Sequence, residues 1–352
     1  MKPRGYRTTV TLAVILTVTL AATLAEGERV RSLRHPVYDA GMRYAIAIPQ
    51  IYADGSFSPD DFKSYFARVE ELGVYESAWT QESPLSRSPQ LAPLEVMTYA
   101  AACTTSLRLG CTVFVTTVHS PVHLAKSITS LDQLSGGRVE VGVGSGGPRR
   151  QFAAFGLSGD RYVARFTEGV ELMKELWTAP TVTFDGEFFQ LSGARMEPKP
   201  YQKPHPRLWF GGSAEAAVRR GVRLCDAFFG AGQATTAAFA AQVNVVREEL
   251  AAAGRATGFG PGEFPIAKRV YIGINQADPA QARERMNTAL ANIYGQRIPA
   301  IEAAAVTGTA AEVAAGVRAV IDAGAELILF TPLWDLREHM ELVAAEVIPA
   351  LG

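Results

Sequence analysis

Short apolar runs alternate with amphipathic stretches throughout residues 42–352. Runs that are apolar on both faces indicate buried strands, and apolar positions at helical spacing indicate helices between them. The chain contains eight such candidate strands, at residues 44–48, 76–80, 111–117, 138–143, 207–211, 226–230, 269–274 and 326–331. Each is followed by helical spacing, first over residues 60–72 and last near residues 337–347.

Eight strand–helix units in this length predict an α/β fold, a (β/α)8 TIM barrel, since such barrels need roughly 250 residues or more. A doubly wound open sheet has the same alternation and is the alternative. The alternation of strand and helix is interrupted once at length, by an insertion at residues 148–206 between the fourth and fifth strands. Within it, Asp185-Gly186 predicts a two-residue hairpin turn, and the proline-rich residues 198–206 are expected to run extended.

The first 41 residues have a different pattern. Residues 8–25 are uncharged, follow Lys2, Arg4 and Arg7, and end in small residues, which is typical of a signal peptide or a short membrane anchor. Met42, however, opens what reads as the first strand of a domain with its own start codon. Two hypotheses therefore stand: a leader of residues 1–41 that exports or anchors the protein, or a cytoplasmic protein translated from Met42, which is slightly favoured.

The net charge restricts the kinds of molecule that the protein could bind, and the cysteine content indicates its redox compartment. The chain has 34 basic and 35 acidic residues, and residues 42–352 retain 28 basic and 32 acidic ones, a net charge of −4. Such a domain has no positive field to attract nucleic acid, so a small organic substrate is expected. Three scattered cysteines, without a C-x-x-C pair, indicate a reduced compartment and no disulfide framework.

Candidate chemistry in a barrel lies on the loops after the carboxyl ends of the strands. Glu82 follows the second strand, where a carboxylate could bond a cofactor ring or move a proton, or simply be a surface acid. The fourth strand leads into a G-x-G-x-x-G match ending at Gly147, but that motif belongs after the first strand of a βαβ unit. These glycines would instead let the backbone approach a flat ligand, with Arg149 or Arg150 near an anionic group, or form a plain turn.

A second glycine-rich loop follows the fifth strand. Gly211-Gly212-Ser213 leads directly into a helix. The free amides at a helix amino end attract phosphate, and Ser213 could bond a ligand oxygen or act as the N-cap of the helix.

Other polar clusters do not support chemistry. His119 and His123 are four residues apart, but Pro121 between them breaks the helical geometry of a metal site and no third ligand is near. The chain has no G-x-S-x-G elbow of a serine hydrolase. Asp132 and Arg138 are expected to pair across a turn at the amino end of the barrel, a structural role.

Several segments resemble the luciferase-like flavin and deazaflavin oxidoreductases. They are HSPVHLAKSITSLDQLSGGRVEVGVGSGG, RFTEGVELMKELWT, VTFDGEFFQL and PKPYQKPHPRLWFGG, and the resemblance extends from Met42 to about Leu333. It implies a (β/α)8 barrel, usually a homodimer, that binds FMN or coenzyme F-420. An FMN enzyme would monooxygenate its substrate with reduced flavin from a separate reductase, whereas an F-420 enzyme would transfer hydride directly.

The resemblance also assigns site residues. It places a non-prolyl cis peptide at Thr112-Val113, behind the cofactor ring, and an acidic residue that contacts the ring or substrate at Glu82. It implies that the remaining cofactor contacts come from Ser145, Gly146, Gly147 and Arg150 after the fourth strand, and from Gly211, Gly212 and Ser213 at the cofactor phosphate.

The chain departs from the family pattern at Ser83, where many members have a histidine that donates a proton. Gly147 stands where some sugar-phosphate-oxidising members have a glutamate, so neither that activity nor light emission is expected. The insertion slightly favours F-420. The alternative from another class is an exported or membrane-anchored barrel that binds a ligand without catalysis. Tyr52, Trp79 and Phe152 could line a pocket, although packing is the favoured role.

Overall fold

The structure is a computed structural model that describes residues 41–52, 57–86, 88–146 and 152–352. Residues Met42–Gly352 form one compact unit. The predicted leader and both hypotheses about its role fall outside the described residues, as do Gly147 and Arg150.

Eight parallel strands close into a barrel. Their order is β1, β2, β3, β4, β7, β8, β9 and β11, and β1 pairs with β11 while β9 pairs with both β8 and β11. The closure confirms the TIM barrel and excludes the open sheet. The strand bounds are Arg43–Ala47, Ser77–Thr80, Arg108–Val115, Val139–Gly144, Leu208–Phe210, Ala227–Gly230, Ile266–Ile274 and Leu327–Pro332.

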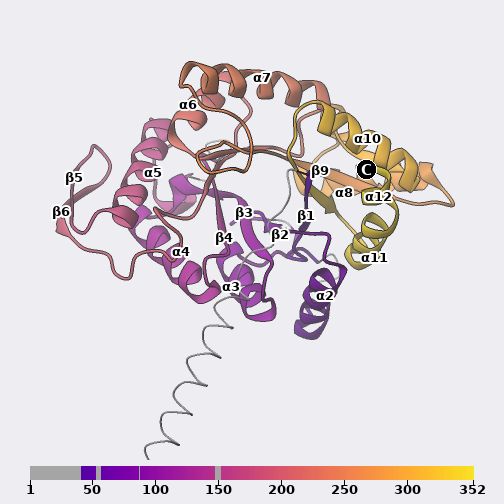
Figure 1. The fold of residues 1–352 in the computed structure, drawn as a ribbon, viewed down its shortest axis with the longest axis horizontal. Helices are drawn as coiled ribbons and strands as arrows, with labels where there is room; N and C mark the ends of the chain where they lie inside the picture. Colours follow the sequence, from indigo (N-terminus) through magenta and orange to yellow (C-terminus); the bar gives the residue numbers. More distant parts are fainter. Residues whose placement is uncertain (1–40, 53–56, 87, 147–151) are drawn as a thin grey trace, which may run out of the picture. The chain divides into compact units, whose positions relative to one another are not determined.

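Helices surround these strands (Figure 1). Their amino ends are fixed by side-chain caps, such as Ser58, Thr235 and Asp278, and often by proline in the first turn. The longer ones are α2 (Pro59–Leu72), α3 (Pro93–Cys103), α4 (Pro121–Ser135), α5 (Tyr162–Thr178), α6 (Glu215–Leu224), α7 (Thr236–Ala252), α8 (Pro279–Tyr294) and α10 (Ala310–Asp322). Shorter helices are η1 (Thr116–Val118), η2 (Phe152–Phe155), α9 (Pro299–Glu302), α11 (Leu336–Leu342), η3 (Val343–Val347) and α12 (Ile348–Ala350).

The core has two layers. One lies between strands and helices, and the other fills the barrel with Ala45, Trp79, Trp209, Ala227, Phe229, Ala267, Leu327 and Leu329. The rings of Trp79 and Trp209 meet edge to face, with centroids 5.5 Å apart. A Cβ at Gly110 would lie 2.3 Å from the Trp79 ring, so this glycine makes room for the indole. Trp79 thus packs in the barrel interior and also lines a cavity described below. Buried Phe152 packs against Tyr162.

Polar groups at the amino end of the barrel are structural. Buried Glu140 accepts hydrogen bonds from Arg108 and from the Trp209 indole, each at 2.6 Å. The expected pair between Asp132 and Arg138 is wrong. Asp132 instead accepts from the backbone and side-chain nitrogens of Gln202, while the Arg138 guanidinium donates to Thr104 and to four backbone carbonyls, which satisfy it without a carboxylate.

The insertion forms a hairpin that extends beyond α5, away from the central strands (Figure 1). Its strands are β5 (Val182–Asp185) and β6 (Gln190–Ala194), and Asp185 pairs with Gln190. The turn therefore spans residues 186–189, and the predicted two-residue turn is wrong. The Glu168 carboxylate on α5 accepts from the amides of Glu187, Phe188 and Phe189, which holds the wider turn.

Two further observations complete the fold. The short strand β10 (Val306–Gly308), which the sequence pattern did not predict, pairs with the end of β9. Within the described part of the chain, no helix combines the length and apolarity needed to cross a membrane.

Candidate functional site

The loops after β3, β4 and β7 form the half of the barrel mouth where the cofactor contacts were predicted. The Thr112–Val113 peptide is cis, as the resemblance implies, and the pairing of β3 with β4 shifts register between Cys111 and Phe114. The Val113 side chain fills the space beside two glycines, because a Cβ would lie 2.6 Å from it at Gly144 and 2.5 Å from it at Gly211. A Cβ at Gly212 would meet the Phe210 ring at 2.6 Å. Gly211 and Gly212 thus make room for Val113 and Phe210, and their contact with a ligand stays a prediction.

The β4 loop is held by hydroxyl groups from the neighbouring strand end. The Thr116 hydroxyl accepts from the Gly144 amide at 3.2 Å and donates to its carbonyl at 3.1 Å, and the Thr117 hydroxyl donates to the Ser145 carbonyl at 2.9 Å. Gly146 has φ +83°, a conformation that favours glycine. The backbone at Ser145 and Gly146 is therefore held by the segment that follows β3, and these two predicted residues lie beside Val115 and Thr117.

The predicted phosphate site lies at the start of α6. The N-cap residue is Ala214, without a side-chain cap bond, so Ser213 is not the N-cap. Ser213 is exposed, and its carbonyl accepts from the Gln242 side chain at 3.3 Å. An uncapped helix start beside an exposed hydroxyl offers donors that fit a phosphate group.

Glu82 is paired with a histidine that the sequence reasoning did not connect with it. Glu82 Oε2 accepts from the Val115 amide at 2.6 Å, and Glu82 Oε1 lies 2.8 Å from His119 Nε2. The Glu82 side chain is 7% exposed and that of His119 is 26% exposed. Because β2 and β3 are neighbours, their following loops meet, and this adjacency was the signal that could have identified His119 from the sequence.

This carboxylate–imidazole pair can move a proton. The carboxylate fixes the orientation of the ring and favours a proton on Nε2, which leaves Nδ1 as the basic nitrogen. Imidazole exchanges protons near neutral pH, and His119 is accessible enough to reach a ligand. The fold thus places an imidazole beside Glu82, although the residue that follows Glu82 in the sequence is Ser83.

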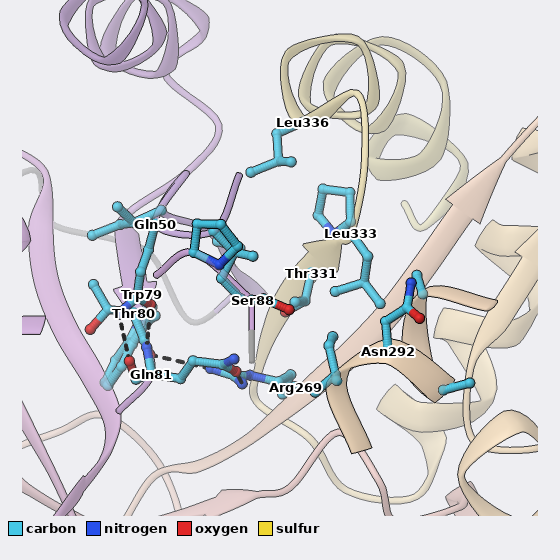
Figure 2. A pocket seen from close by; sticks show the side chains of 18 of the residues that line it. Gln50, Trp79, Thr80, Gln81, Ser88, Arg269, Asn292, Thr331, Leu333 and Leu336 are labelled. Atoms are coloured by element: carbon cyan, nitrogen blue, oxygen red, sulfur yellow. Dashed lines mark hydrogen bonds between the residues drawn. The ribbon is translucent and has the colours of Figure 1, made fainter. Parts of the chain in front are cut away.

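A cavity of about 470 Å³ opens on the other half of the barrel mouth (Figure 2). It lies at the ends of β1, β2 and β11, beside the middle of β9, and next to the last turns of α8. Trp79 and Thr80 lie at its β2 side. Its apolar lining includes Ile48, Ile51, Pro89, Leu333 and Leu336, and its polar lining includes Gln50, Gln81, Ser88, Asn292 and Thr331.

Arg269 extends from β9 across the cavity to β2, as Figure 2 shows. Its guanidinium donates to Gln81 Oε1 and to the Thr80 carbonyl at 3.2 Å, and also to the carbonyl of the cis peptide at Thr112, at 3.3 Å. Gln50 in turn holds Gln81 through both its backbone nitrogen and its carbonyl. Sequence reasoning missed Arg269, although two adjacent charges, Lys268 and Arg269, within an apolar strand were a visible signal.

The described residues contain no group of three or more histidines, cysteines or acids that could hold a metal ion.

Lys268 faces away from Arg269, toward α7, where its amine donates to the carbonyls of Ala231 and Arg269. Burial, together with the charge of Arg269, lowers the pKa of Lys268 to about 7.

Comparison with known proteins agrees with this geometry. A family model described as luciferase-like monooxygenase matches residues 39–327. The FMNH2-dependent dimethylsulfone monooxygenase of Pseudomonas putida is 36% identical over 152 residues, which cover 42% of each chain. The F420-dependent glucose-6-phosphate dehydrogenase of Kineococcus radiotolerans is 27% identical over 326 residues, covering 84% of this chain and 94% of that protein. The chain spans half or less of the length of the first curated relatives it matches.

Solved structures share the fold. The monooxygenase RslO1 from Streptomyces bottropensis superposes with a TM-score of 0.75 at 23% identity, over 88% of this chain and 100% of that one. An F420-dependent secondary alcohol dehydrogenase, in complex with an F420-acetone adduct, gives 0.74 at 19% identity, over 89% and 99%.

Proposed function

Since the chain belongs to the luciferase-like monooxygenase family, we propose that it is a flavin- or F-420-dependent oxidoreductase of a small organic substrate. When bound, the cofactor supplies the redox chemistry, either hydride transfer or activation of oxygen. The chain supplies binding, orientation and a proton. The observation that carries this proposal is the Glu82–His119 pair, which is bonded to the β3 backbone at Val115, two residues after the cis peptide.

Two groups of donors would hold the cofactor. The backbone at Ser145 and Gly146 would contact the ring, and the start of α6 with Ser213 would bind the phosphate. Gly212 would contribute its amide. The Gly211 amide already donates to the Val143 carbonyl at 3.0 Å, so Gly211 would contact the cofactor only through its other backbone atoms. The lack of side chains at both glycines leaves room for Val113 and Phe210. Gly147 and Arg150 belong to the same proposal on sequence grounds alone.

The roles of Glu82 and His119 follow from their geometry. Glu82 bonds the backbone of β3 through one oxygen and orients His119 through the other, so it is a positioning residue for the imidazole. His119 would donate a proton from Nδ1, or accept one there. The other partner in this transfer would be the atom of substrate or cofactor whose charge changes in the reaction.

A binding experiment tests the cofactor site. We would titrate the full chain with FMN, riboflavin and coenzyme F-420 and follow the fluorescence of each. Ser213→Glu places a negative charge at the start of α6 and should weaken FMN binding at least tenfold while leaving riboflavin, which lacks the phosphate, unchanged. Ser130→Glu, an exposed position on α4, is the matched control. If neither FMN nor F-420 binds at micromolar concentration, the proposal is wrong.

We also propose that translation starts at Met42, that the protein acts in the cytoplasm as a homodimer, and that an FMN enzyme would receive reduced flavin from a separate reductase. Expression from the native upstream region, followed by mass spectrometry of the amino terminus, tests the start. A mature protein that begins near Glu26 outside the cytoplasm would contradict it. Sedimentation of the purified protein tests the dimer.

A further inference from the structure

His339 on α11 is a buried histidine that the proposed function does not use. The residue is 2% exposed and lies where two strands of the barrel separate. The pairing of β11 with β9 ends at Pro332, opposite Ile272. Two residues further along β9, the Ile274 amide donates to His339 Nε2 at 3.1 Å. The imidazole thus replaces the strand partner that β11 no longer provides.

This contact requires a neutral ring. A histidine nitrogen accepts a hydrogen bond only when it carries no proton, so Nε2 is unprotonated. The proton therefore lies on Nδ1, which donates to the Asp335 carbonyl at 3.1 Å. In an imidazolium ring, the N–H at Nε2 would face the N–H of Ile274, and neither group could accept from the other. Protonation of His339 would therefore break its bond to β9.

The segment that His339 joins to β9 lines the cavity. Pro332, Leu333 and Leu336, at the end of β11 and the start of α11, are lining residues. Between them, Asp335 has φ +43°, in the left-handed region that side chains other than glycine rarely adopt. Such a conformation costs energy and persists only when the surrounding contacts enforce it. The segment is therefore expected to relax when one of these contacts is lost.

Other contacts of this segment are weaker than the histidine bond. Arg285 on α8 pairs with Asp335 at 2.8 Å and lies over the Trp334 ring, 4.9 Å from its centroid. Both side chains of this ion pair are about half exposed, so the pair contributes little. The Trp334 ring meets that of His339 edge to face, with centroids 5.3 Å apart. The buried Ile274 amide, which would lose its acceptor, makes His339 the stronger restraint.

The charged groups that face His339 come from α8 and from the start of α11. Burial has the largest effect and lowers the pKa of His339 below its ordinary value. Asp335 and Glu338 oppose this shift, and Arg285 adds to it. The ring would bind a proton more readily once it left this site, so acid favours the released segment.

We propose that His339 is a positioning residue that holds residues 332–336 against β9 while its ring is neutral, and that protonation releases this segment and opens the cavity. The inference concerns the regulation of the site in the proposed function, and rests on that function only for the ligand that the cavity would hold. Acid should uncover Leu333 and Leu336 and weaken substrate binding, whereas the cofactor contacts predicted on β3, β4 and α6 should be unaffected.

Hydrogen–deuterium exchange of the full chain between about pH 8 and about pH 5 tests the proposal, with rates expressed as protection factors to remove the intrinsic effect of pH. Protection of the Ile274 amide and of α11 should fall about tenfold or more toward the acid end, while that of β1 stays constant. In His339→Gln, the side-chain oxygen can accept from Ile274 and cannot be protonated, so protection should not depend on pH. His205→Gln, at a histidine whose side chain is 7% exposed, is the matched control and should keep the pH dependence.

Photochemical carbene labelling measures the opening of the cavity itself, because the labelling chemistry does not depend on pH. Labelling of Leu333 and Leu336 should increase in acid in the unaltered protein, and should not increase in His339→Gln. Arg285→Gln removes a cation that disfavours the imidazolium, so release should begin at a higher pH. Arg283→Gln, at an exposed arginine on the same helix, is the control and should leave the midpoint unchanged.

Constant protection of the Ile274 amide in the unaltered protein overturns the inference, as does a pH dependence that survives in folded His339→Gln. If His339→Gln does not fold, an unchanged midpoint in Arg285→Gln overturns it. A parallel loss of protection in β1 would mean that acid unfolds the whole barrel, which also overturns a local release.

The outcomes also separate this inference from the proposed function. If neither FMN nor F-420 binds but release depends on His339, the proposed function is wrong and the conformational inference stands. If a cofactor binds and residues 332–336 stay closed in acid, the inference fails and the proposed function stands.

Discussion

Glu82 and His119 illustrate how two side chains from neighbouring loops acquire a shared function. Glu82 is almost fully buried, and one of its oxygens is bound to the β3 backbone. Its other oxygen can therefore orient an imidazole with little loss of conformational freedom. The pair is rigid on the carboxylate side and accessible on the imidazole side, which suits a proton carrier.

Replacement of His119 by glutamine tests this role. The amide side chain could still bond Glu82 but could not exchange a proton near neutral pH, so turnover should fall by roughly 10² or more while cofactor affinity stays unchanged. Substrate-dependent reoxidation of the reduced cofactor measures turnover. His123→Gln, at an exposed histidine on α4, is the control and should have no effect. Unaltered turnover in His119→Gln would remove His119 from the mechanism.

The sequence indicated some of these residues and not others. Glu82 could be predicted because it directly follows a strand, and strand ends are recognisable from apolar runs. His119 stood out only as a possible metal ligand with His123, because the pattern within one segment hides a partner from the neighbouring segment. Arg269 was missed because a buried cation within a strand contradicts the expectation that strand interiors are apolar.

The β5–β6 hairpin depends on a single carboxylate outside it. Glu168 on α5 accepts three amides of the turn at 2.7–3.0 Å, so the turn is stabilised by a residue about twenty positions earlier in the chain. This distant contact explains why Asp185-Gly186 did not form the two-residue turn that local preferences favour. The barrel strands, in contrast, were found from their apolar runs alone, and only the three-residue β10 escaped.

Glu168→Gln should loosen the hairpin without affecting the barrel. The amide oxygen is uncharged and cannot replace a carboxylate that accepts three hydrogen bonds, so the local stability should fall by about 1–3 kcal/mol. Hydrogen–deuterium exchange should become faster at residues 187–194 and remain unchanged in β1 and β11. Glu171→Gln, at an exposed carboxylate one turn further along α5, is the control. Equal protection of the hairpin in both variants would contradict the role of Glu168.

The stability of the whole barrel should depend on pH through Lys268. Burial lowers its pKa from 10.5 to about 7 in the folded protein, whereas the unfolded chain keeps the ordinary value. Below pH 7 the lysine is charged in both states, and the cost of burying the charge is fully present. Between pH 7 and 10.5 the unfolded chain binds a proton that the folded protein lacks, so stability rises with pH.

Lys268→Met should remove this rise. Urea unfolding between about pH 7 and 10 should show a slope for the unaltered protein that exceeds that of the variant by up to about 1.4 kcal/mol per pH unit. The exposed residue Lys63, changed to methionine, is the control and should leave the slope unchanged. Parallel curves for the unaltered protein and Lys268→Met would show that Lys268 stays charged when buried.

The barrel as a whole was the most predictable feature. Eight apolar runs separated by helical spacing predict parallel strands with helical crossovers, which have few ways to bury both faces. The closure of the strands then decided between the barrel and the open sheet. The charge balance of residues 42–352 likewise argues against nucleic acid from composition alone. The cavity was not predictable, because its lining comes from three strand ends, the middle of β9, and α8, which only the closed barrel brings together.

The Val113 side chain fills the gaps beside Gly144 and Gly211. The substitutions that each of these three positions tolerates in evolution therefore depend on the other two. A larger residue at either glycine is excluded while valine occupies position 113, and a smaller residue at 113 would permit it. A larger residue at Gly144 or Gly211 should be tolerated only together with a smaller residue at position 113, which is strong epistasis. Directed evolution of cofactor preference that changes one of these positions at a time should therefore yield no functional variants there. Libraries that vary residues 113, 144 and 211 together should yield them.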